Sequence, residues 1–271
     1  MKSIITILDN QPIEPGERII SLALYGYACF TTFAVDSGQV KGMSYHWERL
    51  TNDAREIFGV APSHGQILEN VGRFLERADD IRPIIVRVTV FPDEFSPANP
   101  EKIASLSILV TGRAPGPAAR GPMRLATVES ARILPGQKTT NMIPNLGARA
   151  ASRRNGYDDA LLINDGMVLE GAMWNIFFGL GNEVVTPPLS AGILPGVTRR
   201  LLLEHGHEFG FSFQERSIGR EELSRYRYCF ATNAATGIVP VRSIDGCDYD
   251  PSREELSRLM AGYRAIPGSR V

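Results

Sequence analysis

Cysteine, histidine and lysine are scarce in this sequence, and these absences narrow its chemistry. The three cysteines, Cys29, Cys229 and Cys247, are odd in number, lie far apart and form no Cys-x-x-Cys pair, which disfavours a disulfide framework or a cysteine metal site. No apolar run approaches the roughly 18 residues that cross a bilayer, and the N-terminal segment lacks the apolar core of a signal peptide. We therefore expect a metal-free protein of a reducing compartment, most simply the cytoplasm, with no membrane partner.

An excess of charge of either sign is also missing. The 271 residues carry 29 basic and 30 acidic side chains, which leaves a net charge of −1. A balanced chain has no whole-molecule attraction for nucleic acid or anionic lipid, so we expect no nucleic-acid partner. The hydrophobic fraction of 43% with 22% charged residues is ordinary for a globular core.

Lysine is the scarcest of the common charged residues. The sequence has only Lys2, Lys41, Lys102 and Lys138, so 25 of the 29 basic residues are arginines. A lysine that forms a Schiff base must be held in a cleft, where partial desolvation keeps its amine nucleophilic. Lys2 is terminal, Lys41 flanks a predicted hairpin and Lys102 lies in a polar loop. Lysine chemistry, if present, therefore points to Lys138, between a Pro-Gly turn and a segment with helical prospects.

The clearest change in composition divides the chain. Residues 112–122 are rich in Gly, Pro and Ala, which neither continue a helix nor a central strand. We expect an N-terminal α/β domain at 1–111, an interdomain linker at 112–122 and a C-terminal α/β domain at 123–271 that carries Lys138. Because strands and helices intermix without strict βαβ alternation, the fold class is predicted to be α+β.

Hydrophobic periodicity predicts the individual elements. The expected strands lie at residues 3–8, 19–24, 29–35, 39–42, 84–91, 105–110, 160–163, 167–170, 175–179, 226–232 and 237–242. The expected helices lie at residues 45–58, 66–78, 197–209 and 253–263.

Three further segments have candidate functional residues, each with an ordinary alternative. Arg49 lies in the first turn of the helix expected at 45–58, off its apolar stripe, and is either an anion-binding or a solvated surface arginine. Glu170 ends an apolar strand, so its partly buried carboxylate needs a cation, which a structural salt bridge or a protonated pyridine nitrogen would supply. At 193–200, Pro195 and Gly196 open a helix whose first N–H groups form either a phosphate cradle or an ordinary helix start.

These segments occur in a recognisable order. Lys138 with Asn141, the run GYDDALL at 156–162, Glu170-Gly171 followed by NIF at 175–177, and LPGVTR at 194–199 together resemble the class IV pyridoxal-phosphate enzymes of fold type IV. That family includes branched-chain aminotransferases, D-amino-acid aminotransferases and aminodeoxychorismate lyases. Further matches at residues 26–32, 46–50, 233–241 and 245–246 extend the resemblance over nearly the whole chain.

The resemblance implies a fold, a cofactor and roles for residues. It implies two α/β domains with pyridoxal 5'-phosphate in the cleft between them, and a homodimer in which a partner loop closes the site. Lys138 would form the internal aldimine and move the substrate proton, and Glu170 would pair with the pyridinium nitrogen. The residues implied to bind the cofactor phosphate are Arg49, Val197, Thr198, Ala235 and Thr236, and those implied to lie on the substrate side are Tyr27, Thr31 and Ala234.

Departures from the family pattern leave the reaction open. Met142 stands near the position of a branched-chain aminotransferase tyrosine, and Gly237 replaces the glutamate of a late turn. Residues 91–95 lack the arginine pattern that binds a substrate carboxylate in the other two branches, whereas CFTT at 29–32 and Asn233-Ala234 favour the lyase branch. The first hypothesis is transamination between an amino acid and a 2-oxo acid. The alternatives are an aminodeoxychorismate lyase, which forms 4-aminobenzoate and pyruvate, and a non-catalytic cofactor-binding protein, against which the retained lysine argues.

Overall fold

The computed structural model describes residues 5–8, 11–12, 17–78, 83–116 and 121–271. Contacts divide the chain into two compact units. Unit 1 comprises Met1–Gly116, Gln137–Asn141 and Gly268–Val271, and unit 2 comprises Pro117–Gly136 and Met142–Pro267. The segment around Lys138 therefore belongs to unit 1 by its contacts, although it follows the expected linker in the sequence. The domain boundaries expected at 112–122 stay a prediction.

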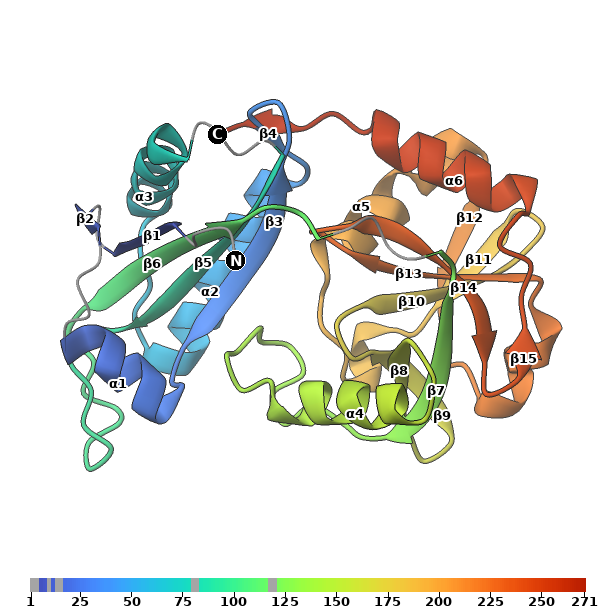
Figure 1. Ribbon diagram of the computed structural model, residues 1–271, viewed down its shortest axis with the longest axis horizontal. Helices are drawn as coiled ribbons and strands as arrows, with labels where there is room; N and C mark the ends of the chain where they lie inside the picture. The colour runs from blue at the N-terminus through green and yellow to red at the C-terminus, as the bar shows by residue number, and fades with distance from the viewer. Residues whose placement is uncertain (1–4, 9–10, 13–16, 79–82, 117–120) are drawn as a thin grey trace. The chain divides into compact units, whose positions relative to one another are not determined.

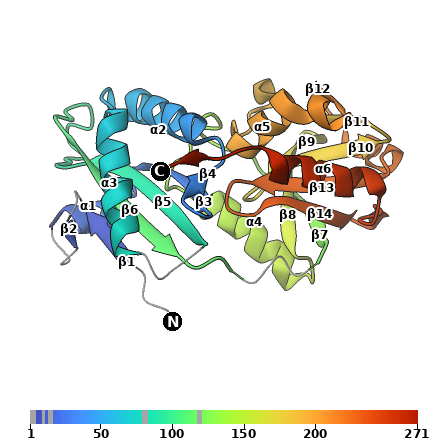
Figure 2. The same ribbon diagram turned by 90° about the horizontal axis from the view of Figure 1, so that it is seen from above.

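Unit 1 contains an antiparallel sheet with two helices packed on one face (Figures 1 and 2). The strand order is β2-β1-β6-β5-β3, and a short pair, β4 with β16, lies outside this sheet. The strands are β1 (Ile5–Leu8), β2 (Gln11–Pro12), β3 (Cys29–Val35), β4 (Gln39–Val40), β5 (Ile84–Pro92), β6 (Leu106–Arg113) and β16 (Ser269–Arg270). The helices are α1 (Glu17–Tyr25), α2 (Met43–Phe58) and α3 (His64–Arg77).

The core of unit 1 follows from strand alternation. In β3 the odd-numbered residues Cys29, Phe33 and Val35 point into the hydrophobic core, where they pack with the buried stripe of α2. That stripe includes Trp47 and Leu50, as the helix predicted at 45–58 requires. The even-numbered residues of β3 consequently lie on the opposite face of the sheet.

One expectation for unit 1 is wrong. Residues 19–24 form part of helix α1 and not a strand, because a short apolar run does not separate the two by periodicity. Gly26, at φ 58°, takes the left-handed conformation that ends a helix, and its N–H donates to the Leu22 carbonyl. Strand β6 runs on through Gly112 and Arg113, the first two residues of the expected linker. A Cβ at position 112 would overlap with the Phe74 ring of α3, so glycine at this position lets the strand pass close to that helix.

Unit 2 is built on a mixed sheet with strand order β12-β11-β10-β13-β14-β7-β8-β9, and β15 pairs with β14 (Figure 1). Its strands are β7 (Met123–Glu129), β8 (Asp159–Asn164), β9 (Met167–Gly171), β10 (Asn175–Leu180), β11 (Glu183–Thr186), β12 (Ser212–Glu215), β13 (Tyr228–Asn233), β14 (Gly237–Ile244) and β15 (Cys247–Asp248). Its α-helices are α4 (Ile143–Arg154), α5 (Val197–His205) and α6 (Glu254–Ala265). Short 3₁₀ helices are η1 (Leu189–Ala191), η2 (Gly206–Phe209) and η3 (Arg220–Arg225).

Strand β8 shows how unit 2 is buried on both faces of its sheet. Leu161 and Ile163 enter one hydrophobic cluster, whereas Ala160 and Leu162 pack against Ala148 of α4. The helix expected at 197–209 is divided, since α5 ends at His205 and continues as η2. Parallel and antiparallel pairs coexist in this sheet, which confirms the predicted α+β class. Within the described ranges, every helix is too short or too polar to cross a bilayer.

Candidate functional site

The backbone of Lys138 is fixed on both sides by unit 1. The Lys138 N–H donates to Asp53 Oδ2 of α2 at 3.0 Å, and its carbonyl accepts from the Phe30 N–H of β3 at 2.8 Å. The next contact, from the Thr140 N–H to the Ala28 carbonyl, keeps the segment alongside β3. The Lys138 Nζ lies 4.9 Å from the centroid of the Phe30 ring, a cation–π distance. The lysine predicted from elimination is thus held in place by two secondary-structure elements.

Arg49 is partly buried on α2 and is oriented by β3. Its Nη2 donates to Thr31 Oγ1 at 2.9 Å, and the same hydroxyl lies 2.7 Å from His46 Nδ1. Because α2 begins at Met43, Arg49 occupies the second helical turn, whereas the sequence predicted the first. The described side-chain contacts of Thr31 are the hydrogen bonds with these two α2 residues. Its predicted position on the substrate side stays a prediction.

His46 is fully buried, and this decides its charge. Burial lowers the pKa of its imidazole well below the ordinary value, and the nearby charges of Arg49 and Lys138 lower that pKa further. The ring is therefore neutral at physiological pH. A neutral histidine adds no positive charge to the surroundings of Arg49 and Lys138.

Sequence analysis missed Arg87, which lies in the middle of β5. It occupies the sheet face opposite the core, where its guanidinium carbon lies 3.7 Å from the centroid of the Phe30 ring. Its Nε donates to Thr89 Oγ1 at 3.2 Å, and burial lowers the pKa of the guanidinium. Within the described part of the chain no carboxylate pairs with it. The signal in the sequence was a single arginine within the apolar run IIVRVTV at 84–90.

Tyr27 packs against the end of α2 and against Phe95. Its hydroxyl donates to the Ile57 carbonyl at 2.8 Å, and its ring makes an edge contact with Phe58 at 5.0 Å between centroids. Phe95 lies 4.9 Å away on the same centroid measure. The described contacts of Tyr27 therefore anchor the end of α2, and its substrate-side role remains untested.

Glu170 of β9 is the buried carboxylate expected in unit 2, with only 2% of its surface exposed. Arg132 Nε donates to its Oε1 in an ion pair. Its Oε2 accepts from the Leu194 N–H at 3.1 Å and from Asn175 Nδ2 at 3.2 Å. The salt bridge that was one of the two expected partners is present, and three donors satisfy the buried carboxylate oxygens.

Helix α5 begins in the same neighbourhood. Asn175 Nδ2 also donates to the Leu194 carbonyl at 2.9 Å, and a Cβ on Gly196 would overlap with Asn175 Oδ1. Val197 and Thr198 are the first two residues of the helix, where backbone N–H groups lack acceptors within the helix. The buried Thr198 hydroxyl lies 3.5 Å from that of Tyr263. The sequence LPGVT therefore produces a close turn that opens α5 with N–H groups that have no acceptor within the helix.

The turn between β13 and β14 is ordered by one side chain. Asn233 Oδ1 accepts from the N–H groups of Ala235 at 3.0 Å and Thr236 at 2.9 Å. The predicted residues Ala234, Ala235 and Thr236 lie together in this turn. Gly237, which follows at φ 77°, closes it under the Tyr263 ring.

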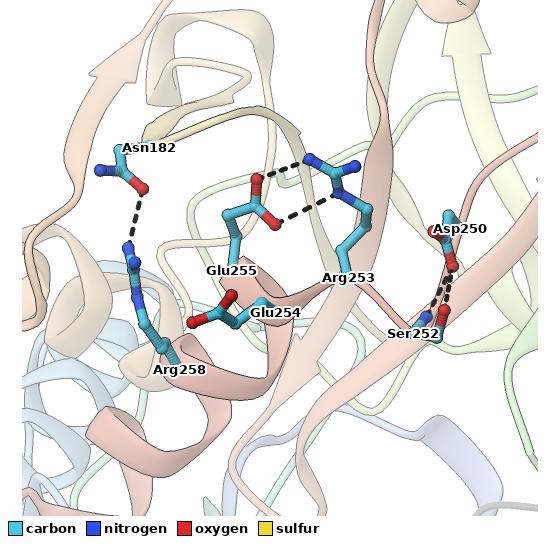
Figure 3. Close-up of a pocket in the computed structure, with 7 residues that line it drawn as sticks. All are labelled: Asn182, Asp250, Ser252, Arg253, Glu254, Glu255 and Arg258. Carbon is cyan, nitrogen blue, oxygen red and sulfur yellow. Dashed lines mark hydrogen bonds and ion pairs between the residues drawn. The ribbon is translucent and has the colours of Figure 1, made fainter.

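Two other polar clusters of unit 2 contain no predicted site residue. Figure 3 shows a surface hollow at the start of α6, where most of the lining side chains bond to one another. Arg253 pairs with Glu255, and Arg258 Nη2 donates to Asn182 Oδ1 at 2.7 Å.

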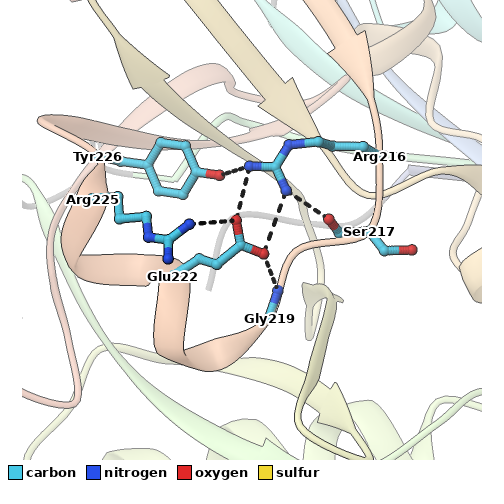
Figure 4. Close-up of polar contacts among 6 residues, drawn as sticks. All are labelled: Arg216, Ser217, Gly219, Glu222, Arg225 and Tyr226. Atoms are coloured by element: carbon cyan, nitrogen blue, oxygen red, sulfur yellow. Dashed lines mark hydrogen bonds and ion pairs between the residues drawn. The ribbon is translucent and has the colours of Figure 1, made fainter.

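Figure 4 shows the second cluster, which ties the loop after β12 to η3. Glu222 accepts from the Gly219 N–H at 3.0 Å and pairs with Arg216, and these two contacts lower the pKa of its carboxyl. Arg216 also donates to the Tyr226 hydroxyl and to the Ser217 carbonyl. The cluster stabilises a loop, and its charges are paired internally.

The fold matches that of fold type IV aminotransferase structures. The chain belongs to the family Amino-transferase class IV, which matches residues 28–244. Enzymes of this family use pyridoxal 5'-phosphate.

Named relatives include both aminotransferases and a lyase. The D-alanine aminotransferase of Bacillus licheniformis is 31% identical over 109 residues, which are 40% of this chain and only 38% of that relative's length. The aminodeoxychorismate lyase of Bacillus subtilis is 27% identical over 264 residues, which are 89% of this chain and 86% of the lyase. The solved branched-chain aminotransferase of Thermoproteus uzoniensis with norvaline is 25% identical, with a TM-score of 0.84, covering 96% of this chain and 93% of that one.

Proposed function

We propose that the protein is a pyridoxal-phosphate-dependent aminotransferase that moves an amino group between an amino acid and a 2-oxo acid. The observation that carries the proposal is the fixed backbone of Lys138, whose N–H is bound by α2 and whose carbonyl is bound by β3. A lysine that reacts covalently needs such restraint, because its amine must meet a carbonyl carbon in one geometry. Membership of the class IV family supports the same activity.

The residues of each unit fit the cofactor. In unit 1, Lys138 would bind the aldehyde, and Arg49 would bind the phosphate with its guanidinium. In unit 2, the buried Glu170 carboxylate would bind the protonated ring nitrogen. When bound, the cofactor supplies an electron sink for the carbanion at the substrate Cα.

The remaining phosphate contacts would come from unit 2. The Val197 N–H and the Thr198 hydroxyl at the start of α5 suit an anion, because the helix dipole adds positive potential there. Ala235 and Thr236 would contribute from the turn that Asn233 orders.

Lys138 would move the proton, because its Nζ would take it from the substrate Cα and deliver it to C4′, the carbon of the cofactor that carries the aldehyde. Phe30 would exclude water beneath the amine. Arg87 would bind a substrate carboxylate, because it is a partly desolvated cation over the same ring and no described carboxylate neutralises it.

Reduction with borohydride tests the cofactor assignment. The purified protein, loaded with pyridoxal phosphate and reduced, should show the cofactor mass on the peptide that contains Lys138. K138A should lose this label, whereas K102A, which removes an exposed loop lysine, should retain it. Labelling of K138A to the wild-type level would contradict the proposal.

Lyase chemistry is the second candidate, and the long match to the Bacillus subtilis lyase favours it. Incubation of the loaded protein with amino donors separates the two reactions. Transamination converts the cofactor to its pyridoxamine form, seen as a change in the visible spectrum. Consumption of aminodeoxychorismate with no such conversion would establish the lyase instead. A protein that binds the cofactor and performs neither reaction would match the non-catalytic alternative.

A homodimer and a cytoplasmic location are proposed from family membership alone. Light scattering after size-exclusion chromatography tests the dimer. A mass near 29.8 kDa, that of one chain, would contradict it.

A further inference from the structure

Asp53 contacts the candidate lysine from a buried position on α2. Its Oδ2 accepts the Lys138 N–H at 3.0 Å, and only 3% of its surface is exposed. Arg49 lies one helical turn earlier on α2, so the two side chains project from the same face of the helix. The sequence places Asp53 and Lys138 85 residues apart, and their contact joins the helix to the loop.

We propose that Asp53 is a positioning residue for Lys138, which fixes the lysine backbone on α2 and provides a negative charge near its amine. The proposal rests on the proposed function, because it concerns the same lysine. It assigns to Asp53 two separable roles, that of a hydrogen-bond acceptor and that of a charge.

The environment of Asp53 supports a role beyond packing. Burial raises the pKa of its carboxyl to about 6, although the hydrogen bond from the Lys138 N–H and the charge of Arg49 lower it. A buried carboxyl group whose pKa is raised is often found at functional sites. The carboxylate is therefore charged above about pH 6, where the amine of Lys138 can respond to it.

Other titratable groups face Asp53 from each neighbouring element. On α2 they are Arg49 and Glu56, and His46 lies two turns before Asp53 on the same helix. The loop contributes Lys138, and β3 contributes Cys29, whose thiol pKa is raised by burial and by the Asp53 charge. His46 is neutral and the Cys29 thiol is protonated, so neither competes as a charge. Glu56 is exposed and accepts from the Gln137 side chain, next to Lys138 in the chain.

Three substitutions separate the roles. D53N keeps an oxygen that can accept the Lys138 N–H but removes the charge, and D53A removes both. E56Q is the matched control, because it removes a charge from the same helix beside the same loop without touching the Lys138 backbone.

Competitive acetylation of the cofactor-free protein measures the charge role. Trace acetic anhydride reacts with deprotonated amines, and mass spectrometry of the labelled peptides gives an apparent pKa for each lysine. In D53N we expect the apparent pKa of Lys138 to fall by several tenths of a unit or more, because a nearby anion that stabilises the ammonium is lost. Lys2, Lys41 and Lys102 serve as internal references and should not shift, and E56Q should shift Lys138 by less than half as much.

Cofactor uptake measures the acceptor role. We expect D53A to take up pyridoxal phosphate about tenfold more slowly or more weakly than wild type, and D53N to stay within about threefold. An unshifted Lys138 in D53N, or wild-type uptake in D53A, would overturn the proposal. If D53A does not fold, the D53N and E56Q labelling still decides it. Failure of the wild-type protein to trap the cofactor at Lys138 would instead overturn the proposed function, whatever the labelling of D53N shows.

Discussion

Thr31 Oγ1 accepts a hydrogen bond of 2.9 Å from Arg49 Nη2, so a strand residue orients a helix guanidinium. The same oxygen lies 2.7 Å from His46 Nδ1. The hydroxyl therefore accepts from Arg49 and shares a second hydrogen bond with His46. Arg49 is thus held by β3 and α2 together.

Removal of the Thr31 hydroxyl should weaken cofactor binding through Arg49. We expect T31V to bind pyridoxal phosphate about tenfold more weakly, because a hydrogen bond to a charged group contributes on the order of 1.5–3 kcal/mol. T31S, which keeps the hydroxyl, should bind nearly as wild type in a spectroscopic titration. Thr51 is the control, because its buried hydroxyl has no hydrogen-bond partner in the described ranges, and T51V should bind normally. Equal affinities for T31V and T31S would contradict the role of the hydroxyl.

The titration of Asp53 should shape the pH dependence of stability. Its carboxyl pKa rises from 3.8 to about 6 on folding, so the folded state retains a proton that the unfolded state has lost between these values. Stability contributed by this group therefore falls as pH rises through that window. In urea unfolding of the cofactor-free protein, D53N should match wild type near pH 4 and exceed it by about 1–3 kcal/mol at pH 8.

The difference between D53N and wild type isolates this group, because the titration of His46 occurs in both proteins and cancels. His46 acts in the opposite direction, since its lowered pKa makes acidification below about pH 6.5 destabilising. A D53N advantage that is constant from pH 4 to pH 8 would show that Asp53 does not titrate as described.

The ion pair of Glu170 and Arg132 should dominate local stability in unit 2. E170A leaves the largely buried guanidinium of Arg132 without its carboxylate and should cost about 3–5 kcal/mol. A double-mutant cycle with R132A should give a coupling of about 1–3 kcal/mol in denaturant unfolding. The exposed pair Arg73 and Glu69 on α3 is the control, and its coupling should stay below about 0.5 kcal/mol. Equal coupling energies for the two pairs would contradict the prediction that burial strengthens the interaction of Glu170 with Arg132.

Two glycine-to-alanine substitutions should change the free energy of unfolding in opposite directions. At Gly196 a Cβ would overlap with Asn175 Oδ1, so G196A should destabilise unit 2 by about 1–3 kcal/mol and disturb the start of α5. At Gly147, within α4, a Cβ meets open space, so G147A should stabilise by about 0.5–1 kcal/mol. Thermal unfolding of the two variants measures both effects, and a stabilising G196A would refute the close contact.

The helix α2 and the strand β3 were predictable because their patterns are long and regular. Trp47 and Leu50 repeat at helical spacing, and the hairpin after β3 is marked by Ser37 and Gly38, whose φ angles of 51° and 72° suit a tight turn. The run at 19–24 was too short to be assigned in this way. Helix α1 is defined by its end at Gly26, which periodicity does not show.

For the candidate site residues, burial could be predicted from the sequence, but their partners could not. Glu170 was expected to be buried because it ends an apolar strand, and it is. Its partner Arg132 could not be predicted, since that arginine is one of 25 and lies 38 residues away. Arg87 was visible in the sequence as a charge in an apolar strand, but which sheet face it occupies depended on the register of β3 and β5.

The sequence by itself determined the family, the α+β class and the choice of lysine, because these depend on residue types and local order along the chain. Four lysines with three poor positions left Lys138. Only the tertiary structure decided what holds that lysine, since Asp53 and Phe30 reach it from 85 and 108 residues away. Local propensity carries no information about contacts at such separations. They follow from the packing of α2 on β3, which places the loop at 137–141 beside both.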